Sequence, residues 1–192
     1  MIEKRPQAAF PKPHRVILSG CSSAGKSSIL DALKLRGYAV VPEAGRQVVR
    51  EELDAGGHAL PWADASTFVE RAVARAIHQF ENVPADRRHV IFDRAVIDLV
   101  SFLEYKRLPV PQRLHNALRS YRYSRTVLIA PPWREIYVDD GERRKSFEQA
   151  IGEYEVLARW YRNEGYSLLE VPKDDVEERA DFCERHLRTL KP

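Results

Sequence analysis

Short apolar runs alternate with longer amphipathic stretches along most of the chain. Compact apolar runs bounded by turn residues are typical of buried strands, whereas apolar positions three or four residues apart predict amphipathic helices. Strands and helices that alternate in this way favour an α/β fold with a parallel sheet. The pattern predicts strands at 15–19, 38–41, 89–93, 125–130 and 166–171, and helices at 26–36, 47–56, 61–82, 95–105, 112–121, 147–165 and 174–190.

The ends of the chain differ in composition. Residues 1–14 combine three prolines with basic side chains, which predicts a flexible, exposed arm. Residues 15–192 contain no internal repeat, low-complexity segment or linker, and their length suits one α/β domain with a substantial core. The formal net charge of +3 is too small to indicate a nucleic-acid partner.

The cysteines and the longest apolar runs indicate the compartment. Cys21 and Cys183 belong to no Cys-x-x-Cys pair, which favours a reduced chain over a disulfide scaffold. No apolar run approaches the ~20 residues of a membrane span, and no secretory signal is visible. We therefore expect a cytoplasmic protein without a transmembrane segment.

One segment fits a specific chemical pattern. Residues 20–27 match G-x-x-x-x-G-K-[ST], the P-loop or Walker A pattern, between an apolar strand and a helix. Its glycines allow a tight turn that aims backbone N–H groups at phosphate oxygens, beside the positive end of the helix dipole. Lys26 would reach the β- and γ-phosphates, and the Ser27 hydroxyl would bind Mg²⁺. This predicts a site for ATP or GTP with Mg²⁺, formed by Gly20, Cys21, Ser22, Ser23, Ala24, Gly25, Lys26, Ser27 and Ser28.

Charged residues follow the second predicted strand. Ligands of open parallel sheets bind beyond the carboxyl ends of the strands, so Glu43 and Arg46 would lie near the P-loop if the first two strands are neighbours. Glu43 is a candidate general base for an acceptor hydroxyl, or a ligand of Mg²⁺ through water. Arg46 would meet a phosphate or an anionic acceptor. In the alternative interpretation Glu43 is an ordinary first-turn helix carboxylate paired with Arg46.

The third predicted strand ends in an aspartate, as a Walker B strand does. Asp93 would support Mg²⁺ and orient Ser27 or a water molecule. The alternative is a helix cap, a common role for an aspartate at a strand end. Arg94 and Asp98, one helical turn apart, would help to hold the acceptor.

The fourth predicted strand leads into a highly charged segment. Such a run is usually a solvated loop, but here it follows a strand whose carboxyl end should face the phosphates. Arginines on a closing flap would neutralise charge on the transferring phosphoryl group. Arg143 is the main candidate for this lid, and Arg144 is the second. Pro172, after the last strand, would pass near the nucleotide base without deciding between adenine and guanine.

The order of these segments resembles the nucleoside and nucleotide kinases among P-loop proteins. This resemblance implies a three-layer α/β/α sandwich, a five-stranded parallel sheet in the order 2-3-1-4-5, and an arginine lid. More narrowly, residues 20–27, 43–46 and 92–98 resemble the NadR-like family of AAA-type ATPases, and segments 140–147 and 171–182 extend the likeness. That family includes ribosylnicotinamide kinases and is similar to a trafficking protein that binds GTP and phosphoinositides, so it implies catalysis or regulation.

Two functional hypotheses follow. In the first, the chain is a kinase that transfers the γ-phosphate of ATP to a nucleoside-like hydroxyl acceptor. Lys26, Glu43, Asp93 and Arg143 are then catalytic, and Arg46, Arg94 and Asp98 bind the acceptor. In the second, it is an ATP- or GTP-dependent regulatory NTPase with a protein or an anionic lipid surface as partner. Nucleic acid is not expected as a partner in either.

Overall fold

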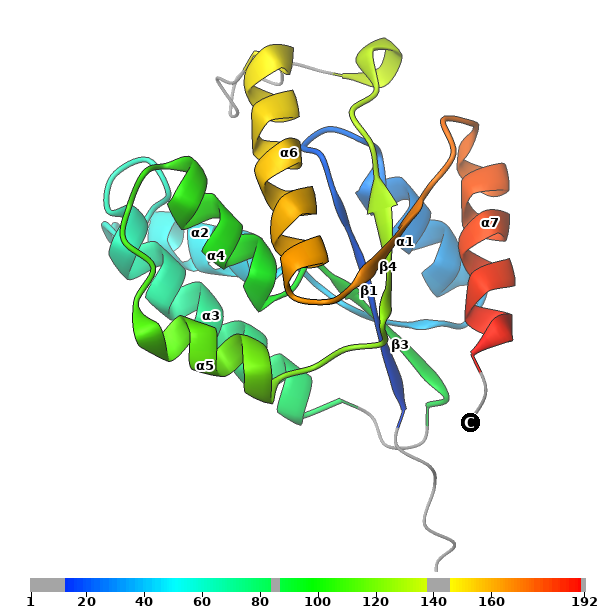
Figure 1. The fold of residues 1–192 in the computed structure, drawn as a ribbon, viewed down its shortest axis with the longest axis horizontal. Coiled ribbons are helices and arrows are strands. Elements are labelled where there is room, and N and C mark those ends of the chain that lie inside the picture. Colours follow the sequence, from blue (N-terminus) through cyan, green and yellow to red (C-terminus); the bar gives the residue numbers. More distant parts are fainter. Residues whose placement is uncertain (1–12, 84–86, 138–145, 191–192) are drawn as a thin grey trace, which may run out of the picture.

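The computed structural model describes residues 13–83, 87–137 and 146–190. Five strands form one parallel sheet in the order β2-β3-β1-β4-β5, which confirms the predicted topology (Figure 1). The central strands are buried, whereas the edge strands β2 and β5 are partly exposed. The strands span His14–Gly20 (β1), Ala39–Val41 (β2), His89–Asp93 (β3), Thr126–Ala130 (β4) and Ser167–Glu170 (β5).

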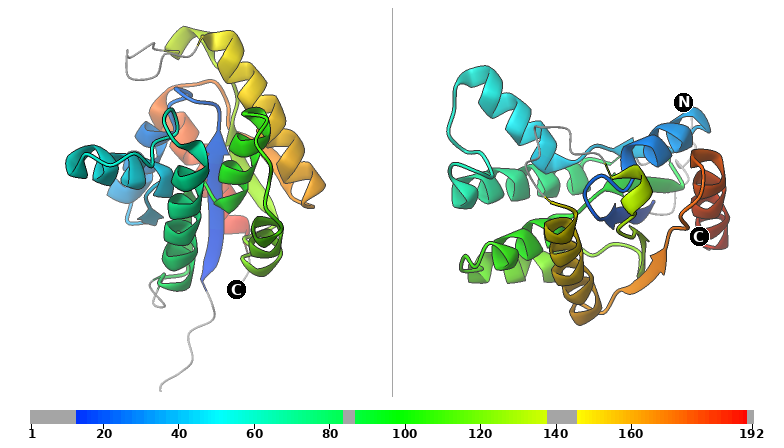
Figure 2. Two further views of the ribbon diagram at one scale, coloured as in Figure 1. Left: turned by 90° about the vertical axis from the view of Figure 1, so that its left-hand side faces the viewer. Right: turned by 90° about the horizontal axis from the view of Figure 1, so that it is seen from above.

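Helices cover both faces of the sheet, as expected for a three-layer sandwich. One face packs against α1 and α7, and the other against α2 to α6 (Figure 2). Because helices cover both faces of the sheet, the buried part of β1, Val16–Leu18, is a continuous apolar run. The helices span Lys26–Leu35 (α1), Ala44–Ala55 (α2), Ala65–Glu81 (α3), Val96–Tyr105 (α4), Gln112–Ser120 (α5), Phe147–Asn163 (α6) and Val176–Thr189 (α7), and Arg134–Ile136 forms a 3₁₀ turn, η1.

Two helix starts differ from the predicted bounds. The helix expected over 61–82 begins only at Ala65, because the Asp64 side chain accepts a hydrogen bond from the Thr67 N–H and caps it there. In contrast, α2 begins at Ala44, separated from β2 only by Pro42 and Glu43, and continues through the helix predicted over 47–56. Glu43 therefore stands at the helix boundary, where its carboxylate faces the carboxyl edge of the sheet.

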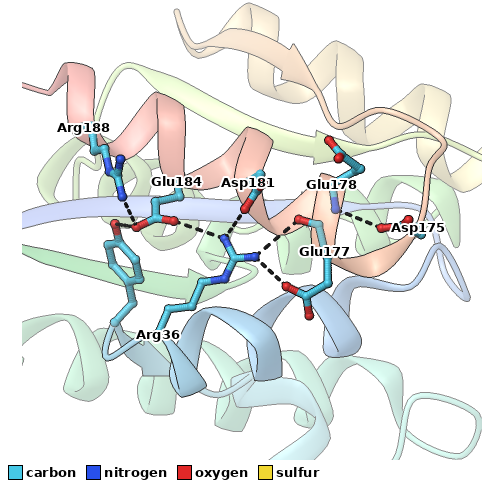
Figure 3. A network of polar contacts seen from close by, with 8 residues as sticks. Arg36, Asp175, Glu177, Glu178, Asp181, Glu184 and Arg188 are labelled. Carbon is cyan, nitrogen blue, oxygen red and sulfur yellow. Dashed lines mark hydrogen bonds and ion pairs between the residues drawn. The ribbon is translucent and has the colours of Figure 1, made fainter.

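An ion-pair cluster fastens α7 to the far end of α1. Arg36, which follows α1, contacts Glu177, Asp181 and Glu184 at N–O distances of 2.6, 2.5 and 3.1 Å (Figure 3). Arg188 adds a 2.8 Å contact to Glu184. Because most of these carboxylates are exposed to solvent, water screens the cluster, and we expect each pair to contribute little.

Candidate nucleotide and acceptor site

The P-loop segment, residues 20–27, connects β1 to α1 at the carboxyl edge of the sheet. Gly20 has a φ of 129°, and a Cβ there would lie 2.2 Å from the Ala130 carbonyl oxygen. Gly25, with a φ of 72°, occupies the N-cap position of α1. The Cys21 N–H donates to the Ala130 carbonyl oxygen at 2.9 Å, which ties the loop to β4. Glycine is therefore required sterically at residue 20 and favoured conformationally at residue 25.

The first turn of α1 directly follows the P-loop glycine Gly25. Among the described residues no side chain caps this turn and none in it is acidic, so its backbone N–H groups remain available to an anion. Ser27 and Ser28 are exposed in the same turn. Free backbone donors and exposed hydroxyl groups are features that suit a phosphate chain and a metal ion.

The remaining P-loop side chains have different environments. Ala24 and Cys21 are buried, and the Cys21 thiol lies 3.5 Å from the Ala150 carbonyl oxygen. Ser23 has a φ of 55°, the left-handed region, while Ser22 is half-buried. The loop therefore bears mainly small side chains, which let its backbone approach a ligand.

Lys26 folds back into the P-loop segment. Its Nζ donates to the carbonyl oxygens of Cys21, at 2.6 Å, and Gly20, at 3.3 Å. Burial and the positive charge of Arg94 lower the pKa of Lys26 to about 7, against the opposing charges of Asp93 and Glu43. The ammonium group therefore lies within electrostatic reach of the charged residues that follow β2 and β3.

Arg94 is the centre of those residues. Its backbone has a φ of 66°, and its N–H donates to the Leu18 carbonyl oxygen at 3.1 Å. Its guanidinium pairs with Asp98 at 2.9 Å and with Glu43 at 3.5 Å. Burial opposes its charge, but Glu43, Asp98 and Asp93 together raise its pKa. A left-handed non-glycine residue costs about 1–3 kcal/mol and persists where its surroundings hold it, as this network does.

Asp98 joins four donors from three parts of the chain. Both of its carboxylate oxygens are occupied: one by the Ser19 hydroxyl and Arg94, the other by the Ala95 N–H at 2.9 Å and the Tyr161 hydroxyl at 2.6 Å. Burial and Asp98 together raise the pKa of Tyr161 well above its usual value, so this hydroxyl stays a neutral donor. The carboxylate is fully engaged by these donors, and Asp98 lines the same small cavity as Glu43 and Arg94.

Sequence reasoning missed Ser19 and Tyr161, although each carried a signal. Ser19 is a polar residue that directly follows the apolar run Val16–Leu18 of β1, next to the first glycine of the P-loop segment. Tyr161 lies among the buried residues of α6, where a tyrosine hydroxyl needs a partner. Both are now explained by the carboxylate of Asp98.

Glu43 and Asp93 line a narrow cavity with Arg94. Glu43 makes no capping hydrogen bond, and its carboxylate lies 3.7 Å from Arg46, which is half-exposed. The Asp93 Oδ1 atom is buried and has no hydrogen-bond partner among the described residues. Burial and the charge of Glu43 raise the pKa of Asp93. The cavity of ≈ 20 Å³, also lined by Gly45, admits one water-sized polar group.

The proposed arginine lid lies outside the described residues. Arg143 and Arg144 fall in the segment 138–145, for which the structure gives no placement. The structure does describe η1, which lies in the same connection between β4 and α6. Within η1, Arg134 pairs with Glu148 at 3.1 Å, at the exposed start of α6. Pro172 is half-buried and follows β5 after one intervening residue, Val171, at the carboxyl edge of the sheet.

The described side chains could supply only part of the ligands of a metal ion, so a bound substrate would have to supply others. Within residues 13–83, 87–137 and 146–190, no three His, Cys, Asp or Glu side chains gather to form a metal site. Mg²⁺ in phosphate-binding proteins does not need such a cage, because substrate phosphates and water supply most ligands beside one or two carboxylates. The orphaned oxygen of Asp93 and the exposed Ser27 hydroxyl fit that arrangement. In the same part of the chain, no helix is long and apolar enough to cross a bilayer.

The comparisons with known proteins agree with this architecture. Residues 15–179 match a protein family described as an AAA domain. No curated protein matches the chain in sequence. Deoxyadenosine kinase from M. mycoides has a similar fold, with a TM-score of 0.63 and 14% identity over 92% of this chain and 100% of that one.

Two further solved structures share the fold. Shikimate kinase from Acinetobacter baumannii gives a TM-score of 0.57 at 13% identity, over 95% of this chain and 98% of that one. NadR in complex with NR gives 0.70 at 19% identity and covers 93% of this chain, which corresponds to only 52% of that NadR chain. At these identities the likeness establishes a P-loop kinase-like fold and leaves the substrate open.

Proposed function

The chain belongs to the AAA domain family, and from that premise we propose that it is a P-loop kinase that transfers the γ-phosphate of ATP to the hydroxyl group of a small, nucleoside-like acceptor. The observation that carries this proposal is the convergence of Lys26 with Glu43, Asp93 and Arg94 at one edge of the sheet. A protein that only binds nucleotide has no need for a second charged pocket beside its phosphate loop. A kinase needs one to orient and deprotonate its acceptor.

The nucleotide side of the site uses the P-loop segment and α1. Backbone N–H groups and the helix dipole bind the phosphates of ATP or GTP, and Lys26 turns from the loop carbonyls to the β- and γ-phosphates. Ser27 and Asp93 hold Mg²⁺, which would neutralise phosphate charge. Arg143, with Arg144 beside it, closes over the transferring group, and Pro172 borders the base.

The acceptor side is the pocket between Glu43 and Arg94. Its small volume admits the reacting hydroxyl while the rest of the acceptor lies outside, against Arg46 and Arg94. Glu43 takes the proton of this hydroxyl. The acceptor oxygen then bonds to the γ-phosphorus as the bond from that phosphorus to the bridging oxygen breaks, and ADP leaves. Asp98 acts through Arg94, which it orients.

The test is nucleotide turnover with Mg²⁺ and ATP or GTP, measured against a panel of nucleosides that includes nicotinamide riboside. Release of ADP or GDP that depends on the acceptor, and that Lys26→Ala abolishes, would support the kinase. Tight nucleotide binding with only slow, acceptor-independent hydrolysis would contradict it and favour a regulatory NTPase. Sedimentation with anionic vesicles, with and without nucleotide, then tests for a lipid partner.

A further inference from the structure

Arg179 is a buried cation on the outer side of the P-loop segment. It lies in the first turns of α7, and only 2% of its surface is exposed. Its Nη2 donates to the Ala24 carbonyl oxygen at 2.8 Å, and its guanidinium lies over the ring of Trp133 at 5.2 Å. A Cβ at Gly25 would lie 2.6 Å from Nη1. The side chain thus extends from α7, which packs against α1, and contacts the loop that precedes α1.

The charge of Arg179 is uncompensated within the described part of the chain. No carboxylate there forms an ion pair with it, and its Nε has no hydrogen-bond partner. Burial lowers the pKa of Arg179 for this reason. A buried charge without a counter-ion is costly to the folded state. Arg36 and Arg94, in contrast, pair with carboxylates.

The contact with Ala24 has a geometric consequence for the loop. A trans peptide unit is planar, and its C=O and N–H groups point in opposite directions. Since Arg179 holds the Ala24 carbonyl outward, the N–H of Gly25 in the same peptide unit points away from Arg179. Gly25, with its left-handed backbone, directly precedes Lys26. Arg179 therefore controls the direction of a donor in the predicted phosphate cradle.

We propose that Arg179 is a positioning residue for phosphate binding. It fixes the Ala24–Gly25 peptide so that the Gly25 N–H faces the phosphate chain, and its counter-charge is the bound polyphosphate. This inference rests on the nucleotide binding proposed above and adds α7 to the elements that determine affinity. It requires no particular acceptor, so it is independent of which hydroxyl is phosphorylated.

The experiment compares Arg179→Met, Arg179→Lys and the control Arg185→Met, which removes the same charge from an exposed position on the same helix. Calorimetry measures the affinity of the full chain for Mg·ATP, Mg·ADP and magnesium tripolyphosphate. We expect Arg179→Met to weaken all three about tenfold or more, and Arg185→Met to leave them unchanged. Arg179→Lys should recover part of the loss, because it restores the charge without the guanidinium fork.

Two readouts separate this role from a merely structural one. The unfolding temperature without ligand should stay equal or rise in Arg179→Met, because a costly buried charge is removed. The ¹⁵N–¹H signal of Gly25 should shift when tripolyphosphate binds the native chain and shift less in the variant. If Arg179→Met unfolds, the same comparison is made with Arg179→Lys, whose predicted loss lies between the native chain and Met.

The outcomes are distinguishable. An Arg179 variant that unfolds at a lower temperature yet binds tripolyphosphate as the native chain does would overturn the inference. An equal loss in Arg185→Met would also overturn it, because bulk charge would then be the cause. A native chain that binds nucleotide in an Arg179-dependent way but phosphorylates no acceptor would support the inference and contradict the kinase. A native chain that binds neither nucleotide nor tripolyphosphate would refute both.

Discussion

Two clusters in this molecule have similar chemistry and opposite surroundings. Around Arg36, three carboxylates of α7 meet one guanidinium on the outside of the protein (Figure 3). Around Arg94, Asp98 and Glu43 meet one guanidinium at the carboxyl edge of the sheet, where only 5% of the Asp98 side chain is exposed. Water screens the first cluster and is excluded from much of the second. Arg36 forms more ion pairs than Arg94. Because the cluster around Arg94 is buried, however, we expect stability to depend more on the partners of Arg94.

Removing the carboxylate of Asp98 should have the largest effect on stability of the changes considered for the two clusters. Asp98→Asn removes the negative charge that pairs with Arg94. It also replaces a carboxylate that accepts hydrogen bonds from Ser19, Ala95 and Tyr161 by a neutral amide. We expect a loss in the free energy of unfolding on the order of 3–5 kcal/mol, as for other buried pairs that lose one member. Urea denaturation measures it. Asp181→Asn, the matched change beside Arg36, should cause no measurable loss, and equal losses would contradict the distinction.

The next largest effect tests what the buried cluster does. Glu43→Gln keeps the shape of the side chain but removes the base, so turnover with a productive acceptor should fall about 100-fold or more. The affinity for Mg·ATP should hardly change, because the P-loop segment is intact. Steady-state kinetics and calorimetry separate the two quantities. Equal losses in turnover and ATP affinity would mean that Glu43 supports the nucleotide rather than the acceptor.

The pH dependence of binding sharpens the role of Lys26. Burial holds the pKa of Lys26 near 7 in the free protein, and bound phosphates would keep it protonated. Binding above pH 7 must therefore take up a proton, so the affinity for Mg·ATP should fall with rising pH, at most about tenfold per unit. Calorimetry between about pH 7.5 and 9, in buffers of different ionisation enthalpy, measures this uptake. A flat profile would show that Lys26 stays charged without ligand.

The lowered pKa of Lys26 also makes stability depend on pH. Stability should rise with pH, whereas the affinity for Mg·ATP should fall. The pKa of Lys26 is about 7 in the folded chain, whereas a lysine in water has an ordinary pKa of 10.5, so the unfolded state binds more protons between these values. Stability then rises with pH across that window, and the cost of burying the ammonium group is fully present below about pH 7. Lys26→Met should remove this contribution.

The smallest effect concerns the exposed cluster. Arg36→Met should lower stability only slightly at low ionic strength, because solvent surrounds most of its partners. Raising the salt concentration to about 1 M, where the Debye length is about 3 Å, should abolish the difference from the native chain. The loss in Asp98→Asn should persist at the same salt. A salt-resistant loss in Arg36→Met would show that this cluster is effectively buried.

The order of the strands in the sheet was predicted only from the resemblance to P-loop kinases. The strands and the P-loop segment could be predicted directly from the sequence. These features are local: an apolar run, two glycines at a fixed spacing and a helical period each depend on residues close in the chain. The same locality placed Glu43, Asp93 and Arg94 after their strands, since parallel strands present their carboxyl ends at one edge. The helix expected from residue 61 starts only at Ala65, because its start depends on a single side-chain contact, the cap by Asp64.

Only the tertiary structure decided which distant side chains meet. Ser19 and Tyr161 reach Asp98 across 79 and 63 residues, and Arg179 reaches Ala24 across 155. No periodicity encodes such contacts, because they depend on how helices pack against the sheet. The physical reason is burial: a carboxylate or guanidinium removed from water must find its partner wherever the fold supplies one. Asp98 finds four donors, and Arg179 finds a carbonyl oxygen and an aromatic ring.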